Sequence, residues 1–229
     1  MSELIVEAVL PAVRKRSAFL AFNMRLIREK PLGAVGGVVF LLFMVCGIFA
    51  NFLAPFEMNH TDLTQRLQAP SLAFPFGTDH LGRDVLSRVL IGAQISMIVS
   101  FLAAGIATVI SIVVGVISGY FGGKPDMVIQ RGVDAWMTFP DLVLLIVIVS
   151  IVGPGIPQIV VVLGLLYGIA GSRIVRGAVV SVKENMYTHA SLSIGAPTFH
   201  VMRKHVLPNI MPVVIVLFTT RIGAVILAE

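Results

Sequence analysis

The side chains that could do chemistry are sparse in this chain, and their spacing does not form a catalytic or metal site. The histidines do not have the spacing of metal ligands: His60, His80, His189, His200 and His205. The Gly-Gly-Lys-Pro stretch at 122–125 is not a phosphate loop, because the GxxxxGK[ST] pattern is absent. The single cysteine, Cys46, lies in an apolar run and is interpreted as a small apolar residue. We therefore expect no catalytic residue, no bound metal and no cofactor in this chain.

Composition points to a membrane protein. Hydrophobic residues make up 57% of the 229 residues and charged residues only 13%, whereas soluble domains carry about 25% charged residues. The mean hydropathy is +0.95. The net charge of +5 comes from basic residues that lie between apolar runs, which indicates loops on the cytoplasmic side of a membrane rather than nucleic-acid binding.

Long runs almost free of charge predict an all-α polytopic fold, because about 20 apolar residues span a bilayer. We expect five spans, at 32–56, 89–123, 136–152, 158–172 and 206–228. The basic segment 1–31 has no cleavable signal peptide and is expected to be cytoplasmic, ahead of a transmembrane domain at 32–229. The chain stops at Glu229 within an apolar passage, so we expect a sixth span in the full protein.

Two pairs of glycines stand at GxxxG spacing within these spans. Gly115 and Gly119 form one pair, and Gly164 and Gly168 form the other. Small residues at this spacing let helices approach closely. Glycine is also simply common in membrane helices, and both interpretations stay open.

The external loop predicted at 57–88 contains the stretch FGTDHLGRDVLSR. Its polar and turn-forming residues are Gly77, Thr78, Asp79, Gly82, Arg83 and Asp84. They either position the outer end of the next helix and contact an external partner, or form a solvated charge network.

Three further charged residues stand near or inside the apolar runs. Arg131 and Asp134 are three residues apart, so they share a helix face as a structural or gating pair. Arg221 lies deep in the last run, where a charge is costly. It either meets a solute carboxylate in a pathway, or it extends to the outer interface or pairs with Glu229, and we favour the second interpretation.

The internal loop predicted at 173–205 carries a short semi-polar helix. Tyr187, Ala190 and Ile194 are spaced to form one apolar stripe, and Glu184 lies near the helix start. Gly195 is expected to end this helix.

A second short helix is expected to follow from Pro197. Small residues, Ala190, Ser191 and Ser193, are expected on the surface of the first helix, where they allow it to seat in a groove on a partner protein. The alternative is an amphipathic helix on lipid headgroups, and the residues alone favour neither.

This loop resembles the "EAA" loop of ABC importer permease subunits. Ala190 and Ser191 stand at the two alanine positions, and Gly195 and Leu207-Pro208 follow at the family's spacing. His189 takes the glutamate position and His205 the hydrophobic one. The stretches RKHVLPN, FGTDHLGRD and GGKPDMVIQRGVDAWMTFP resemble the peptide and nickel branch, and most of all its C-type subunit. The sequence departs from the residues usual in the family at His189, Leu192 and Pro197. These departures bear on how strongly the loop would contact the usual ATPase partner.

The resemblance implies a type I ABC importer transmembrane domain in a bacterial plasma membrane, with a cytoplasmic N-terminus. It implies a second, B-type permease subunit, two ATPase subunits that bind ATP and magnesium, and an extracytoplasmic solute-binding protein. The expected solute is a di- or oligopeptide, with nickel or another small solute as the alternative. An ion-coupled transporter is disfavoured, because the runs hold almost no acids. The expected ATPase-docking residues are Glu184, Tyr187, His189, Ala190, Ser191, Ile194, Gly195, Ala196, His205, Leu207 and Pro208.

Overall fold

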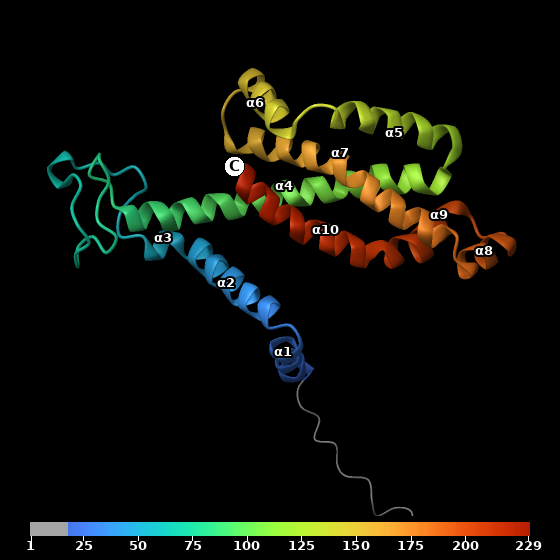
Figure 1. Cartoon of the computed structure of the whole chain (residues 1–229), viewed down its shortest axis with the longest axis horizontal. Helices are drawn as coiled ribbons and strands as arrows, with labels where there is room; N and C mark the ends of the chain where they lie inside the picture. Colours follow the sequence, from blue (N-terminus) through green and yellow to red (C-terminus); the bar gives the residue numbers. More distant parts are fainter. Residues whose placement is uncertain (1–17) are drawn as a thin grey trace, which may run out of the picture.

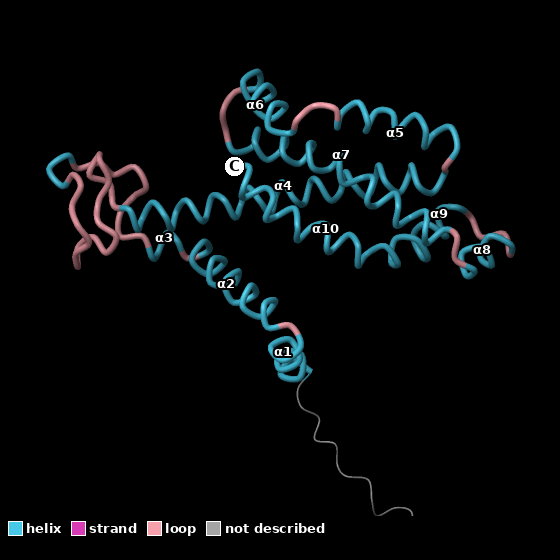
Figure 2. Tube along the Cα trace, in the orientation of Figure 1, coloured by secondary structure: helices cyan, strands magenta, loops and turns pink. Residues whose placement is uncertain are grey.

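The computed structural model describes residues 18–229, and the predicted cytoplasmic segment therefore lies partly outside the described residues. Helices make up nearly all of the described part (Figures 1 and 2). The first elements are α1 (Ala18–Glu29), α2 (Pro31–Ile48), α3 (Ala50–Leu53), η1 (Leu63–Gln65) and α4 (Val85–Phe121). They are followed by α5 (Gly123–Met137), α6 (Asp141–Val152), α7 (Ile156–Lys183), α8 (Met186–Ser193), α9 (Thr198–Val201), the π-helical turn η2 (Met202–Val206) and α10 (Leu207–Ala228).

The predicted all-α membrane fold is confirmed. Four helical stretches are long and apolar enough to cross a bilayer, namely α2, α4, α7 and the continuous stretch Thr198–Ala228. The pair α5 and α6 counts as a fifth, broken span. The external loop and the α8–α9 segment lie at opposite ends of the bundle (Figure 1), as expected for loops on opposite sides of a membrane.

The prediction of one uninterrupted span at 136–152 is wrong. α5 ends at Met137, α6 begins at Asp141, and the two helices are bent by 84°. Pro140 has no backbone N–H and disfavours helical geometry at Phe139, so the helix cannot continue through this point. The turn instead tightens, with the Phe139 N–H donating to the Trp136 carbonyl at 3.4 Å.

Other predicted boundaries also move. The first predicted span breaks early, because α2 ends at Ile48 and a short α3 follows. α4 begins at Val85, four residues before the charge-free run. α7 continues beyond the predicted 172 to Lys183, because Val175 and Val179 are fully buried in the bundle and this packing supports further helical turns.

The helices α4 and α7 pack against each other through the predicted glycine pairs. A Cβ on Gly115 would lie 2.7 Å from the Ser172 carbonyl oxygen, and a Cβ on Gly168 would lie 2.8 Å from the Ile110 Cβ. Real Cβ atoms do not come this close to backbone, so these positions allow the two helices to approach where a side chain would hold them apart. The close-approach interpretation of both glycine pairs is therefore the correct one.

Two apolar clusters hold the bundle together. One contains Val99, Ala103, Val160, Leu163 and Val225, from α4, α7 and the end of α10. The other joins α4 and α7 to the α9–α10 stretch at the opposite end, with Val116, Tyr120, Val175, Val179, Val201, Val206, Ile210, Val214 and Leu217. The short helix α9 and the turn η2 are thus part of the packed bundle rather than a free loop.

Candidate functional site

The short helix α8 lies at the end of the bundle, between the end of α7 and the start of α9 (Figure 1). Glu184 is the residue that follows α7, and Asn185 is the residue that precedes α8. Glu184 therefore lies two residues ahead of the helix near whose start it was expected. A Glu184 carboxylate oxygen lies 3.9 Å from His189 Nε2. The chain therefore turns sharply from a bundle helix into α8 within two residues.

One face of α8 is anchored to the bundle by two hydroxyl groups. The Thr188 hydroxyl is buried and donates to the Val182 carbonyl oxygen at 3.0 Å. The Ser191 hydroxyl lies 3.3 Å from His205 Nε2. The expectation that Ser191 is on the surface is wrong, because it stands one helical turn after Thr188 and shares its buried face. These contacts fix the orientation of α8 relative to α7 and η2.

A neighbouring face of α8 presents the predicted apolar stripe to the outside. Tyr187 is 42% exposed and Ile194 is 85% exposed, and Ala190 lies exposed between them. Met186 and Phe199 are also exposed, at 86% and 73%. Tyr187 is partly covered by its neighbours and the other side chains are largely open to the outside, so the end of the bundle carries an exposed apolar surface, which is the usual mark of an interaction site.

The end of α8 has the predicted glycine stop. Gly195 has φ of +81°, a left-handed conformation that favours glycine. The Gly195 N–H donates to the Leu192 carbonyl at 3.0 Å, and the Ala196 N–H donates to the Ser191 carbonyl at 3.1 Å. Ala196 packs against the apolar cluster of the bundle, so the chain is held on both sides of the stop.

The last three predicted docking residues lie on the path back into the membrane. The His205 ring lies 6.0 Å from the Tyr187 ring. Leu207 packs against the apolar cluster and Pro208 stands in the first turn of α10. α8 is therefore connected to α7 on one side and to α10 on the other through buried, well-packed residues.

The predicted pair of Arg131 and Asp134 is present, but it is not the main contact of Asp134. Arg131 Nη1 lies 3.9 Å from Asp134, and its side chain is largely exposed. Arg173 of α7 makes a closer ion pair with the same carboxylate. The pair thus belongs to a contact between α5 and α7, which the spacing along one helix could not reveal.

A second ion pair between α5 and α7 was not predicted. Arg176 donates from Nε and Nη2 to the two carboxylate oxygens of Asp126, at 2.6 and 2.5 Å. The Ser118 hydroxyl of α4 also donates to Asp126, and Gln130 donates to that hydroxyl at 2.9 Å. The Asp126 side chain is only 15% exposed. This network, which we call the Asp126 cluster, joins α4, α5 and α7 close to the end where α8 lies.

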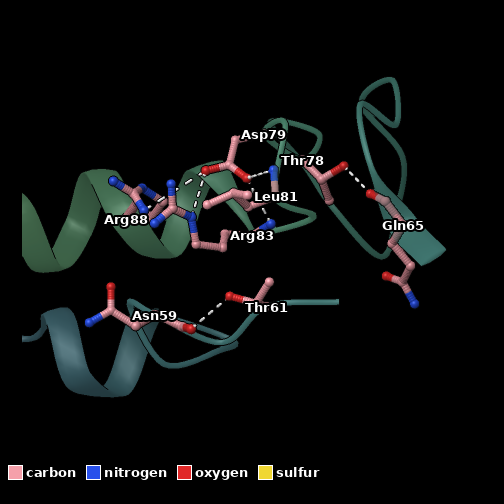
Figure 3. Close-up of polar contacts among 8 residues, drawn as sticks. All are labelled: Asn59, Thr61, Gln65, Thr78, Asp79, Leu81, Arg83 and Arg88. Atoms are coloured by element: carbon pink, nitrogen blue, oxygen red, sulfur yellow. Dashed lines mark hydrogen bonds and ion pairs between the residues drawn. The ribbon is translucent and has the colours of Figure 1, made fainter. Parts of the chain in front are cut away.

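The external motif is a compact loop built around Asp79 (Figure 3). One Asp79 carboxylate oxygen accepts from the backbone N–H groups of Leu81 and Arg83, at 2.8 and 3.0 Å, and the other accepts from the Arg83 Nε at 2.7 Å. Partial burial alone would raise the pKa of Asp79, but these hydrogen bonds outweigh it and lower the pKa to about 2. The carboxylate is therefore charged at neutral pH and acts as the centre of the loop.

The other residues of the motif attach this loop to α4. Asp84 caps the start of α4 by accepting from the backbone N–H of Ser87 at 2.8 Å. The Thr78 hydroxyl donates to the Gln65 carbonyl (Figure 3), and it accepts from the Gln68 N–H at 2.8 Å. Gly77 and Gly82 both have positive φ and lie against backbone of the 62–70 stretch. The motif thus positions the outer end of α4, and its contact with a partner stays a prediction.

Arg221 does not pair with Glu229, which was one of the two forms of the interpretation favoured from the sequence, and its extension to the outer interface stays a prediction. No ion pair with Arg221 is found among residues 18–229. Its guanidinium carbon lies 5.0 Å from the centre of the Tyr167 ring of α7, and its Nε is buried without a hydrogen-bond partner. Arg221 is therefore directed toward α7 within the bundle.

Comparison with known proteins gives two family matches. Residues 111–229, more than half of the chain, match the family described as binding-protein-dependent transport system inner membrane component. Residues 23–70 match the N-terminal TM domain of oligopeptide transport permease C.

Individual relatives agree with these matches. The dipeptide transport system permease protein DppC of Bacillus subtilis is 36% identical over 205 residues, covering 90% of this chain and 64% of that protein. The glutathione transport system permease protein GsiD of Escherichia coli O157:H7 is 35% identical, covering 89% and 68%. The probable D,D-dipeptide transport system permease protein DdpC of Escherichia coli K12 is 34% identical, covering 88% and 68%. The chain thus spans about two thirds of the length of these relatives.

Proposed function

The chain belongs to the family of inner membrane components of binding-protein-dependent transport systems, and on that premise we propose that it is the C-type permease subunit of an ATP-driven peptide importer. In this proposal it pairs with a second, B-type permease subunit to form the translocation pathway. Two ATPase subunits bind ATP and magnesium, and an extracytoplasmic solute-binding protein delivers the peptide. The N-terminus and α8 lie on the cytoplasmic side of a bacterial plasma membrane.

The observation that supports this proposal most directly is the exposed apolar face of α8. A short helix with Tyr187, Ala190 and Ile194 turned outward is suited to seat in a groove of an ATPase subunit. A helix that lay on lipid headgroups would need basic residues along its polar face, and α8 contains no lysine or arginine. The ATPase contact is therefore preferred to the lipid contact.

The attachment of α8 to the bundle supplies a route for force. Thr188 ties α8 to the end of α7, and Ser191 ties it to η2, which continues into α10. Closure of the ATPase subunits on ATP would displace α8, and α7 and α10 would carry the displacement as rigid helices. The Asp126 cluster would make α5 and the end of α4 follow α7.

The proposed solute class is a peptide. The relatives are named for dipeptides, glutathione and D,D-dipeptides, which share a peptide-like backbone with a free carboxylate. The nickel alternative has no comparable support among these names.

The test is reconstitution of the complex in proteoliposomes with the two permease subunits, the ATPase subunits and the binding protein. Peptide uptake should require both ATP and the binding protein, and uptake driven by a proton gradient without the ATPase subunits would overturn the proposal. Ala190→Asp and Gly195→Asp should lower uptake at least about tenfold while ATP hydrolysis and membrane insertion persist, because a charge or a strained stop would disturb the outward face of α8. Ala190→Ser is the matched control and should transport normally. Normal uptake by both aspartate variants would remove the docking claim.

A further inference from the structure

Arg221 carries a charge deep in α10, and none of the described residues 18–229 forms an ion pair with it. α10 begins at Leu207, so at about 1.5 Å per residue Arg221 lies about 21 Å along the helix, inside a hydrocarbon layer about 30 Å thick. A charged residue at such a depth in a membrane helix is energetically costly. A charge at such a position is therefore expected to have a binding partner or a function.

The contacts among the described residues 18–229 leave the hydrogen-bonding groups of Arg221 unused. Tyr167 meets the guanidinium through the face of its ring, which is an interaction with the charge and uses none of the five N–H donors. Asp141, at the bend between α5 and α6, acts electrostatically on Tyr167. It is not within ion-pair distance of Arg221, and among residues 18–229 the buried Nε has no acceptor. The donors are thus held in place and free to bind an anion.

Arg221 lies on the side of α10 that faces α7, because its guanidinium contacts the Tyr167 ring. The next residue, Ile222, lines an apolar pocket together with α2 and α4, and the residues of α2 are almost all exposed and apolar. Arg221 instead contacts α7, and the preceding residue, Thr220, lines a groove of about 370 Å³ between α7 and α10. The rest of this groove is apolar, with Ile174, Pro212, Val213, Val216 and Leu217.

We propose that Arg221, held by Tyr167, binds the carboxylate of the transported solute inside the membrane. A guanidinium binds a carboxylate through two parallel hydrogen bonds, which gives geometric selection as well as affinity. The apolar groove that begins beside Thr220 suits the side chains of a small peptide, and so the pair of features fits a solute that is anionic at one end and apolar elsewhere. This inference rests on the proposed function, and it adds a specificity-determining residue in the membrane-spanning part of the chain.

The test compares two solutes in the reconstituted complex. One is a dipeptide with a free terminal carboxylate and the other is the same dipeptide as its terminal amide, each at a concentration shown to saturate the isolated binding protein. Arg221→Gln should slow uptake of the carboxylate peptide at least about tenfold and leave uptake of the amide within about twofold. Arg221→Lys should retain an intermediate rate for the carboxylate peptide, because it keeps the charge and loses the paired geometry. Thr219→Val is the matched control, since the Thr219 hydroxyl donates only to carbonyls of its own helix.

A second measurement decides the case in which the glutamine variant does not assemble. Arg221→Cys in a Cys46→Ser background should react with a charged, water-soluble thiol reagent, and the carboxylate peptide should slow this reaction when turnover is supported. A cysteine at 221 that stays unreactive both with and without ATP would place the residue against lipid or the second permease subunit and would overturn the proposal.

Equal slowing of both peptides, or carboxylate uptake within twofold of wild type, would also overturn it. These outcomes are distinguishable from failure of the proposed function. If the proposed function itself were wrong, the wild-type complex would show no ATP-dependent uptake of either peptide.

Discussion

Loss of the Arg176 charge should destabilise the chain measurably, because it leaves the Asp126 carboxylate without its main partner. Removing one member of a buried ion pair costs about 3–5 kcal/mol. The Asp126 side chain is 15% exposed but that of Arg176 is 35% exposed, so water reaches part of the pair. We expect Arg176→Gln to lower the free energy of unfolding by about 2 kcal/mol, the discounted value for a partly solvated pair.

The assay is thermal unfolding of the detergent-purified chain, followed by the fluorescence of Trp136, the only tryptophan, which stands in α5 with Asp126. A loss of about 2 kcal/mol corresponds to a melting temperature lower by about 4–8 °C for a chain of this size. Asp126→Asn combined with Arg176→Gln should recover part of the loss, because no charge is left unpaired.

Arg131→Gln is the control for this prediction. Its side chain is 80% exposed and 3.9 Å from Asp134, so its loss should change stability by less than about 0.5 kcal/mol. The reasoning fails if Arg176→Gln shifts the melting temperature no more than Arg131→Gln does. It also fails if the double variant is destabilised by the sum of the two single changes, since that would mean the two side chains do not act as a pair.

Three further predictions concern the packing of the bundle and its two ends. Gly115→Ala should cost about 1–3 kcal/mol in a thermal melt, because its Cβ would meet backbone of α7, whereas Gly105→Ala, which has open space around it, should cost nothing. The pKa of Asp79 is depressed to about 2, so the contribution of this carboxylate is fully present above its ordinary pKa near 3.8 and is lost as pH falls toward 2. Pepsin cleavage of the 57–88 loop should therefore accelerate between pH 4 and pH 2, and Asp79→Asn should cleave rapidly at both values. Thr188→Val keeps the volume but removes the hydroxyl that anchors α8, and it should lower the melting temperature by about 2–4 °C, equivalent to about 1 kcal/mol; an unchanged melt would show that the anchor does not bear on stability.

Features that depend on local rules were predictable from the sequence. The spans follow from runs without charge, the close approach of α4 and α7 follows from glycines four residues apart, and the stop of α8 follows from Gly195. Each of these signals arises within one helix or one turn. The break at Pro140 was also available from local rules, but the apolar run that resumes directly after it favoured a single span.

Features that join distant segments were not predictable in the same way. Asp126 and Arg176 are brought together by the packing of α5 against α7, and residue spacing along either helix carries no information about the other. The prediction that Ser191 lies on the surface of α8 was wrong for a different reason. The apolar stripe of this eight-residue helix is narrow and its other side chains are mostly small or polar, so spacing alone could not show that Ser191 faces the bundle, where its hydroxyl lies beside His205.

The helix α4 extends without interruption from Asp84, its cap in the external loop, to Phe121, beside the Asp126 cluster. Its 37 residues correspond to about 55 Å at about 1.5 Å per residue, and no proline interrupts it. A rod of this length has no internal joint at which its two ends could be uncoupled. We therefore expect a tilt imposed where it meets Asp126 to shift the Asp79 loop at its far end, so that a movement at one end of the bundle reaches the other end through a single helix.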